Sequence, residues 1–138
     1  MKRFLSLSGV CMATIIACLL VPYSIHAQQA GNVKVASAVI CKGIADRQAV
    51  EPGSSFPVSV GKLYCYSNIT NIQTATEVVH TWYYGDVQRA QVRLNVNPPS
   101  WRTYSSKIIQ SHEIGAWRVE ILDATGNLLE TVKFEITP

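Results

Sequence analysis

Short strand-like runs separated by turn residues fill the chain from Val33 onward, and they constrain the fold more than any other feature. No window in this part sustains the 3.6-residue period of an amphipathic helix. The runs are rich in Val, Ile, Thr, Tyr and Trp, the residue types that suit a half-buried pleated surface. They predict seven strands, at residues 33–41, 56–67, 76–84, 87–96, 101–109, 116–122 and 128–136.

Turn signals predict which of these strands are neighbours. Gly85-Asp86 is the whole connection between two runs, and Gly at the first position of a two-residue loop is the signal for a type II′ hairpin. Gly126, within residues 123–127, predicts a longer hairpin between the last two strands. Pro98-Pro99 must end the preceding strand because proline cannot donate to a sheet ladder. Seven short antiparallel strands predict an all-β, immunoglobulin-like sandwich, with a small open β-barrel as the alternative.

The first 27 residues have the plan of a secretory signal peptide. Lys2 and Arg3 precede an apolar run over residues 4–21, and a short small-residue exit follows at residues 22–27. We expect cleavage after Ala27, which leaves residues 28–138 as one exported domain, periplasmic or secreted. The alternatives are an uncleaved membrane anchor and a lipoprotein with its lipid on Cys18. Contact with the membrane is expected only in those two cases.

Charge excludes one class of partner. Without Lys2 and Arg3 the chain keeps ten basic and nine acidic residues, and no cluster of Lys and Arg remains. Nucleic-acid binding needs several phosphate-neutralising cations on one face, so we expect no nucleic-acid partner.

Residues 28–138 contain two cysteines, Cys41 and Cys65. An even pair in an oxidising compartment predicts one disulfide, worth roughly 3 kcal/mol in the chain-entropy model. The alternative is a pair of buried, reduced thiols that pack as small apolar groups. A metal site is not expected from two cysteines without a histidine at ligand spacing.

Catalytic motifs are absent from the sequence. It has no G-x-S-x-G elbow, no H-E-x-x-H, no C-x-x-C and no glycine-rich phosphate loop. The residue types of a Ser-His-Asp site occur only scattered, as any domain of this size contains by chance: Ser105, Ser106, His80, His112, Asp46 and Asp123. A metal on the two histidines would need a third ligand. We therefore expect no catalytic residues, no metal and no cofactor.

Four mixed aromatic and charged clusters stand out, at residues 43–47, 80–84, 101–107 and 115–120. They read G-I-x-D-R, H-x-W-Y-Y, W-R-T-Y-S-S-K and G-x-W-R-V-E. In this order, across Val35 to Ile136, they resemble the bacterial domain-of-unknown-function (DUF) family 2914. The resemblance implies a β-rich domain of bacterial envelope proteins, alone or attached to membrane segments, and it implies no activity or ligand. The chain departs from the family pattern at Gln48-Ala49, where the family often has Pro.

The clusters allow two interpretations. In the structural one, Trp82, Trp101 and Trp117 fill the core, an Arg lies across an aromatic ring, and Asp46 pairs with Arg47 or another Arg. In the functional one, an exposed sheet face binds an acidic sugar, a peptide carboxylate or a lipid headgroup through His80, Trp82, Arg102, Ser105 and Lys107. Strand alternation divides this set, because Ser105 and Lys107 point to one side of their strand and Arg102 to the other.

These observations favour a non-catalytic, exported envelope domain that binds a protein or glycan partner or serves as an accessory module. A hydrolase or other enzyme with an unrecognised site is the alternative. Trp117 is expected in the core, because Trp117, Val119 and Ile121 alternate with Arg118 and Glu120.

Overall fold

Two β-sheets make up the part of the chain that the structure describes. The computed structural model describes residues 32–138, so the predicted signal peptide and Cys18 lie outside the described residues. Residues 32–138 contain no helix long and apolar enough to cross a membrane. Their elements are β1 (Lys34–Ala45), β2 (Gln48–Gly53), β3 (Ser55–Pro57), a 3₁₀ turn (Val58–Val60), β4 (Lys62–Thr70), β5 (Thr76–Tyr84), β6 (Val87–Val96), β7 (Trp101–Ile108), β8 (Gly115–Asp123) and β9 (Leu128–Thr137).

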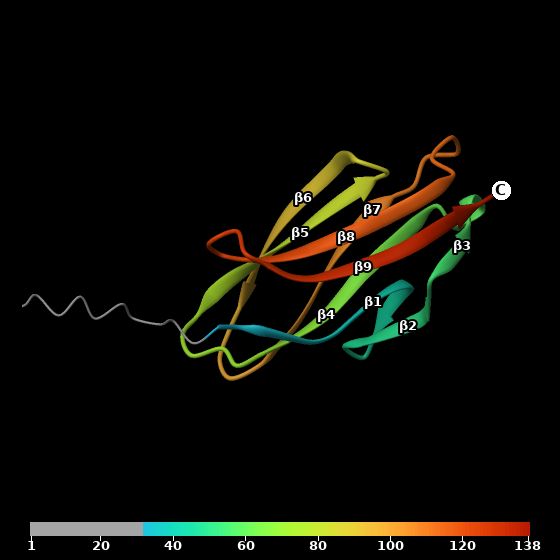
Figure 1. Cartoon of the computed structure of the whole chain (residues 1–138). Helices are drawn as coiled ribbons and strands as arrows, with labels where there is room; N and C mark the ends of the chain where they lie inside the picture. Colours follow the sequence, from blue (N-terminus) through green and yellow to red (C-terminus); the bar gives the residue numbers. More distant parts are fainter. Residues whose placement is uncertain (1–31) are drawn as a thin grey trace, which may run out of the picture.

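The strands form a two-layer arrangement (Figure 1). Sheet A has the order β2-β1-β4-β7 and is antiparallel throughout. Sheet B has the order β3-β9-β8-β5-β6 and is antiparallel except where β3 runs parallel to β9. Neither sheet closes on itself within residues 32–138, so the predicted all-β sandwich is confirmed and the barrel alternative is not.

The structure has nine strands where the sequence predicted seven, and both additions lie before β4. The strand predicted at 33–41 continues to Ala45 and turns back as β2. The run predicted at 56–67 divides into β3, the 3₁₀ turn and β4. The sequence did not predict the β1–β2 hairpin, because its loop, Asp46-Arg47, contains neither Gly nor Asn. Both loop residues nevertheless have positive φ, 51° and 60°.

The predicted hairpins are confirmed. β5 and β6 are antiparallel neighbours joined at Gly85, which has φ 56°. β8 and β9 pair across a loop in which Gly126 has φ 89° and the Asp123 carboxylate accepts backbone N–H groups of Thr125 and Asn127. β6 ends at Val96, ahead of the two prolines.

An aromatic cluster lies at the centre of the core. Trp82 is fully buried and Trp117 is 2% exposed, and both contact Phe134, with ring centroids 6.1 and 5.9 Å apart. The predicted core position of Trp117 is therefore confirmed. Trp101 is 37% exposed, so it does not join them as the structural interpretation expected.

The predicted Cys41–Cys65 disulfide is wrong, because both side chains are free, buried thiols. Ile40 lies opposite Cys65, whereas Cys41 lies opposite Tyr64. Since successive residues of a strand point to opposite faces, this one-residue offset puts the two cysteines on opposite faces of sheet A. Burial raises the pKa of both thiols, which disfavours the reactive thiolate.

Candidate functional site

The structure separates the five residues proposed from the sequence as one exposed face. His80 and Trp82 have no exposed surface, and Ser105 is 5% exposed. Arg102 is exposed, and the half-buried Lys107 donates from Nζ to the backbone oxygen of Ile108 at 2.9 Å. Three of the five therefore belong to the interior, where alternation places them, and only Arg102 faces outward from sheet A.

The interior residues form a chain of hydrogen bonds between the sheets. Trp82 Nε1 donates to Ser105 Oγ at 3.0 Å, and Ser105 Oγ lies 2.8 Å from His80 Nδ1. His80 Nε2 lies 3.1 Å from Ser67 Oγ, which donates to the backbone oxygen of Thr103 at 3.5 Å. Because the indole can only donate, every partner is satisfied when Ser105 donates to Nδ1 and Nε2–H donates to Ser67. This arrangement requires a neutral imidazole.

Burial keeps His80 neutral and keeps its serines away from solvent. Desolvation lowers the pKa of His80 to about 4. A serine nucleophile must reach a substrate carbonyl, and neither Ser67 nor Ser105 is accessible for that. The Ser-His contacts therefore hold the two sheets together and form no catalytic site.

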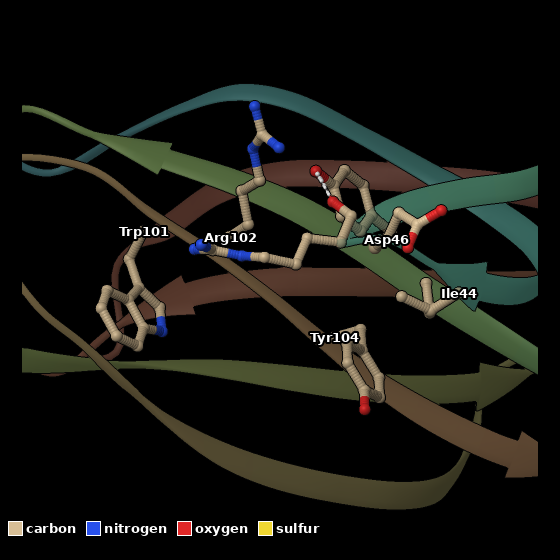
Figure 2. Close-up of a pocket in the computed structure, with 7 residues that line it drawn as sticks. Ile44, Asp46, Trp101, Arg102 and Tyr104 are labelled. Carbon is tan, nitrogen blue, oxygen red and sulfur yellow. Dashed lines mark hydrogen bonds between the residues drawn. The ribbon is translucent and has the colours of Figure 1, made fainter.

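A hollow of about 610 Å³ lies on the outer face of sheet A (Figure 2). Residues from β1, the β1–β2 turn, β4 and β7 line it: Ile44, Asp46, Arg47, Tyr66, Trp101, Arg102 and Tyr104. In Figure 2, Trp101 lies at one end of the hollow, and Ile44 and Asp46 lie at the other. The first and third sequence clusters meet here because β4 lies between β1 and β7, with Tyr66 opposite Tyr104.

The β1–β2 turn borders this hollow in a conformation that suits Asp46 but that Arg rarely adopts. With positive φ at both Asp46 and Arg47, the two-residue loop is of the I′ type, which ordinarily takes Asn or Asp followed by Gly. The Tyr66 hydroxyl donates to the backbone oxygen of Arg47 at 3.1 Å and ties the turn to the face of the sheet. Backbone strain of this kind concentrates at functional sites.

Two unpaired cations give the hollow its charge. Arg47 and Arg102 are both exposed, and within residues 32–138 neither guanidinium lies within 4.0 Å of a carboxylate. The ion pair expected between Asp46 and an Arg is therefore not formed. The hollow carries two positive charges and one negative charge, which suits an anionic ligand.

Exposed aromatic rings lie beside these cations. Tyr104 is 50% exposed, and its ring makes an edge contact with Tyr64 at 5.9 Å between centroids. Lys62 Nζ lies 5.3 Å from the centre of the Tyr64 ring. Trp101 is the first residue of β7 and is 37% exposed, although Ile69, the residue opposite it on β4, is fully buried. The outer face thus offers flat apolar surfaces next to hydrogen-bond donors.

The outer face of sheet B differs, because its central cation is already paired. The guanidinium of Arg118 lies over the ring of Tyr83 at 4.0 Å and reaches Glu120 at 3.5 Å and Asp86 at 3.7 Å. The expected stacking of an Arg on an aromatic ring is confirmed here. Arg118 therefore has fewer free N–H donors than Arg102, because its guanidinium also donates to the backbone oxygen of Gly85 at 2.7 Å.

Arg102 is the one lining residue that the sequence predicted as part of a binding site. Asp46, Arg47, Trp101 and Tyr104 were recognised in clusters but not joined, because their proximity depends on which strands pair. Strand alternation gave a weak indication that Tyr66 faces outward, because its neighbours in β4, Cys65 and Ser67, are buried on the other side.

Metal binding finds no support in the described part of the chain. No three side chains among His, Cys, Asp and Glu come together there as a metal site. His80 is held by serines in the core, and His112 is exposed in the loop after β7, so the two histidines do not combine.

Comparison with known proteins identifies a family for part of the chain. Residues 75–136, from just before β5 to β9, match the model of the family described as "Protein of unknown function (DUF2914)". The resemblance seen in the sequence is thereby confirmed over three of its four clusters. No curated protein matches the chain.

One similar solved structure is that of a beta-D-glucoside glucohydrolase from Trichoderma reesei. It is 11% identical to this chain, with a TM-score of 0.45, and the match covers 78% of this chain and 19% of that one. The chain thus spans only a small part of that enzyme.

Proposed function

We propose that the protein is a non-catalytic, exported envelope domain that binds a protein or glycan partner through the hollow on the outer face of sheet A. This function is inferred from the site itself, because residues 75–136 match the DUF2914 family, for which no function is known. Export rests on the signal-peptide pattern of residues 1–27.

One observation carries this proposal. Arg47 adopts a positive-φ conformation that is unfavourable for its side chain, and the Tyr66 hydroxyl holds its backbone beside a hollow in which neither guanidinium has a carboxylate partner within residues 32–138. The strain at Arg47 does not contribute to folding, since Gly at this position would form the same turn more easily, and the two guanidiniums add no ion pair to the fold within residues 32–138. A function in binding accounts for both.

The strand order supports an immunoglobulin-like topology as a further part of the proposal. β1, β4 and β7 would correspond to strands A, B and E, and β9, β8 and β5 to strands G, F and C. Trp82 on β5 then has the place of the core Trp that marks strand C in that fold.

An enzymatic role has less support. The only histidine hydrogen-bonded to a serine within residues 32–138 is buried between the sheets. The exposed hollow contains one carboxylate and no histidine, cysteine or serine among its lining residues. General acid–base or nucleophilic chemistry has few candidate groups there.

Retention of envelope components by the immobilised protein tests the proposal. Insoluble cell-wall material, soluble envelope polysaccharides and solubilised envelope proteins would be passed over the wild type and over Trp101→Ala and Arg102→Ala variants. We expect the wild type to retain at least one component, and we expect retention to fall about tenfold or more in both variants.

Lys133→Ala is the matched control, because Lys133 is an exposed cation on the outer side of sheet B. It should retain the component as the wild type does. Retention that is equal in all four proteins would exclude the hollow as the site. Turnover of a glycan or ester substrate by the wild type, lost in either hollow variant, would replace the binding function by an enzymatic one.

A further inference from the structure

The hollow combines three chemical features that a single ligand class satisfies. It offers unpaired planar guanidiniums from Arg47 and Arg102, exposed rings from Trp101 and Tyr104, and a hydrogen-bond-accepting carboxylate from Asp46. From this combination we infer that the ligand is a glycan whose sugar rings carry carboxylate groups, such as a uronate-containing saccharide. The inference rests on the proposed binding function of the hollow.

The carboxylate of such a sugar accounts for the cations. A guanidinium presents paired N–H donors that match the two oxygens of a carboxylate. Arg47 and Arg102 come from different parts of the chain, the β1–β2 turn and β7, and neither is paired within the described residues. Their donors are therefore available to a ligand without the loss of an existing ion pair.

The charge balance favours a carboxylate over a phosphate. Asp46 lines the same hollow and reduces its charge to one net positive. A singly charged carboxylate matches this value, whereas a phosphate monoester carries a second negative charge near neutral pH that would face Asp46. The Asp46 oxygens can accept hydrogen bonds from sugar hydroxyl groups.

The aromatic rings and the size of the hollow favour a sugar over a folded protein surface. Trp101 and Tyr104 are 37% and 50% exposed, which leaves ring surface free to stack against the C–H face of a pyranose. The volume, about 610 Å³, falls within the range of small-ligand pockets. A typical protein partner would instead need about 800 Å² of surface on each side.

Equilibrium titration with defined saccharides tests the inference. The probes are a galacturonate oligosaccharide, the same oligosaccharide after reduction of its carboxyl groups to alcohols, and glucose 6-phosphate. Calorimetry gives the affinity, and the fluorescence of Trp101 gives a local signal, checked with Trp101→Phe. We expect the acidic oligosaccharide to bind about tenfold or more tightly than the reduced one, and the preference to weaken with salt.

Three variants separate the parts of the site. Arg102→Gln should remove most of the preference for the acidic sugar. Trp101→Ala should weaken binding of the acidic and reduced oligosaccharides alike. Arg47→Gly should weaken acidic-sugar binding while the melting temperature stays the same or rises, because Gly suits the positive φ of that position. Lys133→Gln should change none of these values.

Other outcomes distinguish this inference from the proposed function. Equal binding of acidic and reduced sugars, or tighter binding of the phosphate, would overturn the carboxylate inference and leave a glycan-binding hollow. Retention of an envelope protein through Trp101 and Arg102, with no sugar bound, would overturn the inference while the binding function stands. Failure to retain any envelope component, together with no binding of either oligosaccharide, would overturn both.

Discussion

Ser105 Oγ lies 2.8 Å from Nδ1 of His80, and this contact joins the two sheets through their interior. Ser105 belongs to β7 of sheet A and His80 to β5 of sheet B. The serine also accepts the indole N–H of Trp82, so one hydroxyl group satisfies two buried aromatic side chains. The neutrality of His80 and the stability of the core therefore depend on the same network.

Acid should destabilise the protein through His80. Its pKa is about 4 in the folded protein against an ordinary value of 6.5, so below pH 6.5 the unfolded chain binds a proton that the folded protein does not. The free energy of unfolding should fall by about 3 kcal/mol as the pH decreases from 6.5 to 4. Urea unfolding at half-unit pH intervals measures this. A His112→Gln control should show the same decline, and a flat profile would contradict the buried neutral state.

Replacement of Ser105 should cost far more stability than replacement of its neighbour Ser106. Ser105→Ala leaves the N–H of Trp82 and Nδ1 of His80 without partners in the core, at an expected cost of about 2–4 kcal/mol. Ser106 faces outward opposite Tyr64, so Ser106→Ala should change stability by about 0.5 kcal/mol or less. Denaturant midpoints of the two variants give the comparison. Equal midpoints would show that the network contributes little.

Trp117 and Trp101 should have opposite roles. Trp117→Ala empties a core site and removes the hydrogen bond from Nε1 to the backbone oxygen of Glu113, so it should cost about 3–5 kcal/mol. Trp101→Ala should lower the stability by a smaller amount, about 1–3 kcal/mol, because more than a third of that residue is already exposed. The melting temperatures of the two variants measure these losses of stability. A Trp117→Ala protein with unchanged melting temperature would refute its place in the core.

Glu113 should contribute more to stability than another paired glutamate. It is 2% exposed, lies 3.3 Å from Arg89 Nε, and accepts the backbone N–H of Gln110 at 2.8 Å. Glu113→Gln keeps a carbonyl oxygen but loses the charge, so it should cost about 1–3 kcal/mol. Glu77→Gln, which breaks the exposed pair with Arg93, should cost less than about 1 kcal/mol. Chemical denaturation of both variants tests the ranking, which equal losses would contradict.

Cys41 and Cys65 should remain thiols even in an oxidising compartment. Their positions on opposite faces of sheet A prevent a bond between them while the sheet is intact, and burial keeps both thiols protonated. Alkylation of the unfolded, non-reduced protein should add two labels by mass spectrometry, while the native protein should label slowly. A mass without added labels would establish a disulfide and contradict this register.

The all-β class, the late hairpins and the core position of Trp117 were determined by the sequence itself. These features are local, because alternation and turn residues act over a few positions along one strand. Gly85 and Gly126 marked their turns since each supplies a positive φ at little cost. The family resemblance could also be recognised from the sequence, because its clusters are continuous stretches of residues.

Only the tertiary structure decided the register of β1 against β4 and the composition of the site. One residue of offset sends Cys41 and Cys65 to opposite faces, and cysteine spacing carries no information about that offset. The Asp46-Arg47 turn was not predicted because Arg47 stands where this turn type usually has Gly, in a conformation that Tyr66 helps to hold. Arg47 meets Arg102 only because β4 pairs with both β1 and β7, and such long-range pairing is set by the burial of the whole sheet face.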